Sequence, residues 1–137
     1  MGTYLNPGIQ LFSEAVNYSY YVDKSGIIAE LNNLIATPAK YVCVSRPRRF
    51  GKTMAANMLS AYYGSGVDSS GMFAGLEIEN HPSFRQHLNK YNVVFINMVE
   101  MINRLSVREM ISRIEKVLSK EFQKAYPDVP MDPDMTF

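Results

Sequence analysis

VSRPRRFGKTMAANML, residues 44–59, decides the predicted fold because a short basic loop in it joins an apolar run to a helical pattern. The run that enters it, KYVCVS at residues 40–45, is largely apolar without alternation, which is typical of a strand covered on both faces. Beyond the loop, residues 52–63 repeat apolar side chains at helical spacing, and Gly64 offers a stop. The order strand, loop, helix favours an α/β domain.

Two further apolar runs extend this prediction to a sheet. Residues 91–97, YNVVFIN, are again apolar without alternation and predict a second buried strand. LEIE, residues 76–79, predicts a short strand before it. Two buried strands separated by helical material are typical of a right-handed crossover, so we predict a parallel sheet with flanking helices.

Helix signals occur on both sides of the central stretch. Residues 24–36, KSGIIAELNNLIA, space their apolar side chains at helical intervals after a predicted extended entry at residues 18–23. Pro38 ends that helix, because proline donates no amide hydrogen and restricts the residue before it. Pro82 is predicted to open a short helix that runs through Leu88.

The clearest helix signal is SVRE, residues 106–109, which matches a capping box between Ser106 and Glu109. The residues after it predict an apolar stripe on one face of the helix, which we expect a sheet to cover. The stripe consists of Val107, Met110, Ile111, Ile114, Val117, Leu118 and Phe122. The last eleven residues, PDVPMDPDMTF, contain three prolines and three aspartates. We therefore predict that residues 1–126 are the amino-terminal part of a domain and residues 127–137 a truncated linker.

Composition limits the classes of function. The 137 residues carry 14 Lys and Arg against 13 Asp and Glu, a net charge of +1, so the chain has no overall field that attracts nucleic acid or anionic membrane. The single cysteine, Cys43, excludes an internal disulfide and is predicted to be an inert thiol inside a buried strand. No apolar run approaches the roughly 18 residues that span a bilayer. We predict a cytoplasmic protein without a membrane partner.

The basic loop contains most of a phosphate-binding pattern. The pattern G-x-x-x-x-G-K-[ST] is met at Gly51, Lys52 and Thr53, while Arg46 stands in place of the first glycine. Gly51 would let the backbone approach a phosphate, Lys52 can reach the β and γ phosphates, and Thr53 can present a hydroxyl group to magnesium. Pro47 would stiffen the loop where the glycine is missing. The alternative is a basic surface loop ahead of an ordinary helix.

Residues 45–53, SRPRRFGKT, resemble the phosphate loop of the bacterial AAA-ATPase-like proteins, in which arginine also replaces the first glycine. The blocks at residues 20–32, 73–78 and 81–98 are similar to successive blocks of the same family. The resemblance implies a P-loop NTPase-like α/β fold that binds ATP and Mg²⁺, with Thr53 at the metal. The nucleotide-binding residues that it implies are Arg46, Pro47, Arg48, Arg49, Phe50, Gly51, Lys52 and Thr53.

The resemblance also implies that part of the machinery lies outside this chain. Many members carry a carboxyl-terminal nuclease-like domain of the PD-(D/E)XK type, and this sequence has no match to it, so nucleic acid is expected as a partner only through such a domain. The family's Walker B strand also lies downstream. The prediction is an ATP-binding amino-terminal portion of an AAA-type ATPase that can form homo-oligomers, with hydrolysis undetermined. The alternative is a module that binds nucleotide without hydrolysis or serves protein interaction.

The role of the arginines is open. Arg48 and Arg49 could clamp phosphate bidentately, act on the nucleotide of a neighbouring subunit, or remain solvated. Direct contact between nucleic acid and the cluster of Arg46, Arg48 and Arg49 is a third functional hypothesis. It is weaker because the chain is nearly neutral and no stacking aromatics accompany the loop.

Several residues outside the basic loop are candidates for a functional role, but each also has a simpler structural explanation. By analogy with related ATPases, Val22 and Asp23 line the adenine side of the nucleotide, or else Asp23 caps the following helix. Glu100 follows the second predicted strand and is predicted to be a surface carboxylate. His81 and His87 are six residues apart, which is not the spacing of two metal ligands on one helix face, so both are predicted at the surface.

Overall fold

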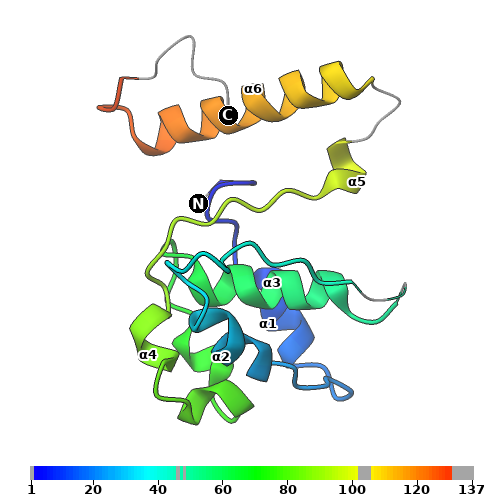
Figure 1. The fold of residues 1–137 in the computed structure, drawn as a ribbon, viewed down its shortest axis with the longest axis vertical. Helices are drawn as coiled ribbons and strands as arrows, with labels where there is room; N and C mark the ends of the chain where they lie inside the picture. Colours follow the sequence, from blue (N-terminus) through cyan, green and yellow to red (C-terminus); the bar gives the residue numbers. More distant parts are fainter. Residues whose placement is uncertain (1, 46, 48, 102–105, 131–137) are drawn as a thin grey trace.

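The computed structural model describes residues 2–45, 47, 49–101 and 106–130. Figure 1 shows the helices α1 to α4 gathered in one layer and α6 lying across the other end of the molecule, with α5 beside it. The extended chain after α4 and the amino-terminal residues pass between them. The elements in chain order are α1 (Gln10–Val16), α2 (Gly26–Asn32), α3 (Lys52–Tyr63), the 3₁₀ helices η1 (Ser70–Phe73) and η2 (Glu77–Asn80), α4 (Phe84–His87), α5 (Met98–Met101) and α6 (Val107–Ala125).

The hydrophobic core is built around the second half of α3. Met58, Ala61 and Tyr62 are buried on one face of this helix, because their spacing of three and four residues places them on the same side. Tyr62 packs edge-on against Phe73 of η1, with the ring centroids 5.5 Å apart. The full cluster of buried side chains joins α1, α2, η1, η2 and α4 to α3: Phe12, Ile28, Met58, Ala61, Tyr62, Phe73, Ile78 and Phe84.

The predicted parallel sheet is not present, since the described residues contain neither a strand nor a sheet. Residues 41–45 are exposed rather than buried, and the side chain of Tyr41 is 86% accessible. A strand exists only where a neighbouring segment completes its hydrogen-bond ladder, and no described segment pairs with residues 41–45. The prediction of a buried, inert thiol at Cys43 is wrong for the same reason, because this cysteine is exposed.

The second predicted strand, residues 91–97, is also wrong. It makes two isolated bridges instead of a ladder, one parallel between Tyr91 and Gly64 and one antiparallel between Val94 and Leu5. The amide of Phe95 donates to the carbonyl oxygen of Tyr4 at 2.8 Å, so the segment is held by the amino terminus. The predicted strand at residues 76–79 falls largely in the 3₁₀ helix η2.

The helix predictions are largely confirmed. α2, α3 and α6 form within the predicted segments, and α4 forms as a shorter helix than predicted. At α6, the amide of Ser106 donates to Glu109 Oε2 at 2.8 Å and the amide of Glu109 donates to Ser106 Oγ at 3.4 Å, which confirms the capping box. The helices α1 and α5 were not predicted. The boundary at residue 126 stays a prediction, and residues 131–137 lie outside the described residues.

Candidate functional site

The turn into α3 is shaped by residues in the left-handed region of the backbone. Gly51 is the N-cap of α3 with φ 79° and ψ 19°, and its carbonyl oxygen accepts the first helical hydrogen bond from the amide of Ala55 at 2.9 Å. Arg49, two residues earlier, has φ 67°. For a residue with a Cβ atom this conformation costs about 1–2 kcal/mol, so the loop is held in an unfavourable shape at Arg49.

Two lysine ammonium groups from different parts of the chain donate hydrogen bonds to carbonyl oxygens of this loop. Lys52 Nζ, from the first residue of α3, donates to the carbonyl oxygen of Pro47 at 2.9 Å. Lys24 Nζ, from the segment before α2, donates to the carbonyl oxygen of Phe50 at 3.1 Å. Residues 24 and 52 are far apart in sequence, so tertiary folding brings a second cation to the loop.

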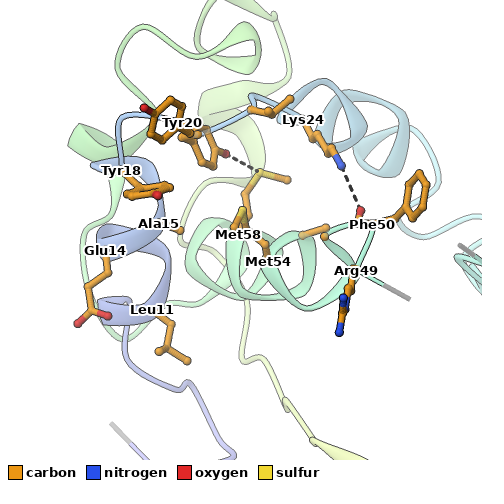
Figure 2. Close-up of a pocket in the computed structure, with 14 residues that line it drawn as sticks. Leu11, Glu14, Ala15, Tyr18, Tyr20, Lys24, Arg49, Phe50, Met54 and Met58 are labelled. Atoms are coloured by element: carbon orange, nitrogen blue, oxygen red, sulfur yellow. Dashed lines mark hydrogen bonds between the residues drawn. The ribbon is translucent and has the colours of Figure 1, made fainter. Parts of the chain in front are cut away.

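A cavity of about 630 Å³ opens beside the loop, between α1, the segment at residues 18–24 and the first turns of α3. Figure 2 shows that its side chains come from all three parts of the chain. Lys24 and Arg49 lie toward the loop, and Leu11 and Glu14 of α1 lie toward the opposite end. The lining residues are Leu11, Glu14, Ala15, Tyr18, Tyr20, Tyr21, Val22, Lys24, Arg49, Phe50, Gly51, Met54, Ala55 and Met58.

The interior of this cavity is mostly apolar. Met54 and Met58 of α3 face the tyrosines of the 18–24 segment in Figure 2, and Tyr21 OH lies 3.9 Å from Met58 Sδ. Partial burial raises the pKa of the Tyr21 hydroxyl, with a smaller contribution from the charge of Asp23, so this phenol stays neutral near pH 7. An apolar cavity with cations at one end can hold a ligand that combines a planar or apolar group with an anionic group.

Asp23 and Ser25 fix the chain on both sides of Lys24. Asp23 Oδ1 accepts from the amide of Ser25 at 2.8 Å, and its Oδ2 accepts from the amide of Glu77 at 2.7 Å. Burial raises the pKa of the Asp23 carboxyl, but the amides of Glu77 and Ser25 outweigh burial and leave this pKa below its ordinary value. Ser25 is fully buried, and its hydroxyl oxygen accepts from the amide of Ile78 at 3.2 Å. The segment is therefore pinned to η2.

The predicted site residues that the structure describes lie together. Pro47, Arg49, Phe50 and Gly51 form the loop, and Lys52 and Thr53 begin α3 with exposed side chains. Arg46 and Arg48 lie outside the described residues.

The predictions for the segment before α2 have different outcomes. Val22 is exposed and lines the cavity. Asp23 does not line it. The capping alternative is not confirmed either, because the N-cap residue of α2 is Ser25 and the helix has no side-chain cap hydrogen bond; Asp23 accepts instead from the amide of Ser25.

The remaining candidate residues have local partners away from the cavity. Glu100 is exposed in α5 and accepts from Asn97 Nδ2 at 2.8 Å, which confirms a surface carboxylate. His81 and His87 are half-buried rather than at the surface, and their Nδ1 atoms contact Ser83 Oγ and Tyr91 OH. In the described part of the chain, no cluster of three or more His, Cys, Asp and Glu side chains forms a metal site.

Sequence reasoning missed Lys24 and the contribution of α1 to the cavity. The string VDKS does place a lysine beside the anchoring residues Asp23 and Ser25, but nothing local shows that its amine reaches Phe50. For α1, the helix lacks a side-chain N-cap hydrogen bond, so the usual start signal is weak. Both contributions depend on contacts across more than 25 residues.

Comparison with known proteins identifies the class of this chain. A family model described as Predicted AAA-ATPase matches residues 6–136. The chain therefore belongs to the AAA-ATPase-like family, as the resemblance at residues 45–53 predicted. Searches of curated proteins and of solved structures returned no significant match. None of the helices in the described ranges has the length and hydropathy needed to cross a lipid bilayer.

Proposed function

We propose that this chain binds a nucleoside triphosphate, ATP by its family, with the phosphates at the loop before α3 and the base in the adjoining cavity. The observation that carries the proposal is the left-handed cap at Gly51. It begins α3 beside one end of an apolar cavity of about 630 Å³, where the amine of Lys24 lies against the Phe50 carbonyl, while the amine of Lys52 donates to the Pro47 carbonyl of the same loop. Membership of the AAA-ATPase-like family supports the choice of ligand.

The phosphates are placed at the N-terminus of α3 because the start of a helix favours anions. The first amides of an α-helix have no partner within the helix, and the positive end of its dipole favours anions. α3 has 12 residues, which is a typical helix length, so its dipole and its first amides can act on an anion in this way. Gly51 presents no Cβ atom, and Lys52 would exchange its bond to the Pro47 carbonyl for a phosphate oxygen. A rearrangement of one side chain therefore supplies the main counter-charge.

The fit of magnesium depends on the nucleotide. Thr53, the second residue of α3, offers an exposed hydroxyl group, which is one oxygen ligand of the kind Mg²⁺ takes. Magnesium in nucleotide sites obtains most of its remaining ligands from phosphate oxygens and water. Thr53 would thus hold the metal together with the triphosphate, and not as an independent metal site.

The base end is supported by the composition of the cavity. Tyrosine rings and methionine side chains provide polarisable surface on which a purine can pack. Val22 adds an exposed apolar side chain at the same wall.

The proposal concerns binding rather than turnover. Hydrolysis in this class needs an acidic residue that helps to hold magnesium and a residue that positions water. Among the described residues near the loop, Asp23 is bound to the amides of Ser25 and Glu77, and Glu14 lies at the far end of the cavity. The described site therefore favours a nucleotide-binding role, and hydrolysis would need an acidic residue from elsewhere.

Mg-ATP at one hundred times its dissociation constant is expected to stabilise the chain by about 2.7 kcal/mol and to raise the melting temperature by roughly 5–10 °C. The measurement is thermal unfolding with and without Mg-ATP. Lys52→Ala should lose most of the shift, because it removes the main counter-charge of the phosphates. Lys90→Ala removes one exposed positive charge near the other end of α3 and should keep the shift. A parent chain that shows neither a shift nor calorimetric binding of Mg-ATP would contradict the proposal.

A further inference from the structure

We propose that Lys24 is a second phosphate-binding cation, which acts with Lys52 on the triphosphate. The inference rests on the proposed nucleotide binding and goes beyond it, because Lys24 lies outside the loop pattern at residues 46–53. Its consequence is that the VDKS segment contributes to recognition of the phosphates as well as to the wall of the cavity.

The contacts of Lys24 place its ammonium group directly against the start of α3. Lys24 Nζ lies 3.1 Å from the carbonyl oxygen of Phe50. A Cβ atom built on Gly51 would lie 3.3 Å from the same nitrogen, so the amine stands over the bare backbone of the N-cap residue. Figure 2 shows the side chain reaching from the segment before α2 down to the loop. An anion at the first amides of α3 would be a near neighbour of this amine.

The chain that carries Lys24 is anchored on both sides. Asp23 binds the amides of Ser25 and Glu77, and the buried hydroxyl of Ser25 binds the amide of Ile78. The backbone of Lys24 is thereby fixed to η2, so less conformational entropy is lost when its side chain engages a ligand. Because the backbone of Lys24 is fixed, its side chain is partly pre-organised to contact a ligand.

The charges around the amine favour an anion. The two carboxylate oxygens of Asp23 accept hydrogen bonds from the amides of Ser25 and Glu77, so the nearest carboxylate along the chain is held by other partners. Arg49 lines the same cavity as Lys24 and adds positive charge. An ammonium group has three N–H donors, so Lys24 can keep its bond to Phe50 and also donate to a phosphate oxygen.

The simpler role for Lys24 is to tie the segment to the loop without touching the ligand. Lys24→Gln separates the two roles, because glutamine keeps an N–H donor that can bond the Phe50 carbonyl but carries no charge. Lys24→Arg keeps the charge. Lys90→Gln is the matched control, since Lys90 is exposed and adjoins Tyr91, whose amide donates to the carbonyl oxygen of Tyr63 at the far end of α3.

The test is isothermal calorimetry on the whole chain, with Mg-ATP and with inorganic tripolyphosphate as ligands, and a urea unfolding curve for each variant without ligand. Lys24→Gln is expected to weaken both ligands about tenfold, with an unchanged urea midpoint. Lys24→Arg should stay within about threefold of the parent, because the charge persists at a similar reach. Lys90→Gln should bind as the parent does.

The outcomes separate this inference from the proposed function. If the parent binds Mg-ATP and Lys24→Gln binds it equally well, Lys24 does not contact phosphate, whereas nucleotide binding stands. If Lys24→Gln binds more weakly and also has a lower urea midpoint, Lys24 stabilises the fold and the inference is overturned. The same conclusion follows if Lys24→Arg loses as much affinity as Lys24→Gln. A parent chain that binds neither ligand overturns the proposed function and this inference together.

Discussion

At the scale of the residue, Gly51 connects backbone conformation to the proposed site. Its φ of 79° is in the region that glycine reaches at little cost, and its missing Cβ leaves room for the amine of Lys24. Any other residue here would be strained and would crowd that amine. One glycine therefore sets both the shape of the loop and the position of the second cation.

Gly51→Ala is expected to destabilise the fold by about 1–2 kcal/mol, because alanine in the left-handed region is strained. It should also weaken Mg-ATP binding, since the new Cβ would press on Lys24 Nζ at 3.3 Å. Urea unfolding and calorimetry measure the two effects. Gly71→Ala is the control, because no atom lies within 4 Å of a Cβ built there and it should change neither property. An unaltered stability for Gly51→Ala would contradict the described geometry of the loop.

At the scale of the element, α3 connects the loop to the core and is closed at its carboxyl end by Asn89. Asn89 Nδ2 donates to the carbonyl oxygens of Gly64 at 2.8 Å and Ala61 at 3.2 Å. Its own backbone has φ 54°, a conformation that asparagine tolerates better than most residues. The last carbonyl groups of a helix need partners, and here a residue 25 positions beyond Gly64 supplies one.

Asn89→Ala is expected to cost about 2 kcal/mol of unfolding free energy, because several partly buried polar groups lose their partner. Asn89→Gly removes the side chain but suits the positive φ, so it should cost less than alanine. Asn80→Ala, at the exposed end of η2, serves as the control. Urea denaturation gives the values. A loss from Asn80→Ala as large as that from Asn89→Ala would remove the basis for assigning a capping role to Asn89.

At the scale of the whole molecule, α6 is joined to the rest of the chain through a carboxylate. Glu121 accepts hydrogen bonds from the backbone amides of Thr3, Tyr4 and Leu5 at 2.7, 2.9 and 2.7 Å. Partial burial raises the pKa of Glu121, but these amides outweigh burial, and the pKa lies below its ordinary value. The amino terminus in turn pairs with residues 93–95, so Glu121 connects α6 to the segment that follows α4.

Glu121→Gln is expected to lower the free energy of unfolding at pH 7 by about 1–2 kcal/mol, because a charged acceptor of several amides becomes neutral. Since the folded pKa is depressed, the stabilisation from Glu121 is fully present above the ordinary pKa of 4.5 and is lost as pH falls through the folded value. The parent and the variant should therefore converge in acid. Urea unfolding between pH 7 and pH 3 tests this, with Glu115→Gln on the same helix as the control. A constant difference across that range would show that Glu121 does not act through its charge.

Within this molecule the predictability of an element depended on how local its hydrogen bonds are. The capping box at Ser106 and Glu109 joins residues three apart, and α6 begins where it predicts. The apolar runs at residues 40–45 and 91–97 suit strands equally well by composition, but neither forms a ladder among the described residues. Apolar composition alone does not supply the hydrogen-bonding neighbour that makes a segment a strand.

The features of the candidate site also differ in whether local sequence could predict them. Sequence by itself determined the helix that starts at Lys52 with a glycine before it, because these features depend on residues that are neighbours in the chain. It also determined membership of the AAA-ATPase-like family, because that match compares residues 6–136 by sequence alone. Only the tertiary structure decided that α1 and the segment at residues 18–24 enclose a cavity beside this loop, and that Lys24 reaches the Phe50 carbonyl. Such placements depend on packing around Tyr62 and Phe73, which joins residues far apart in sequence and has no local signature.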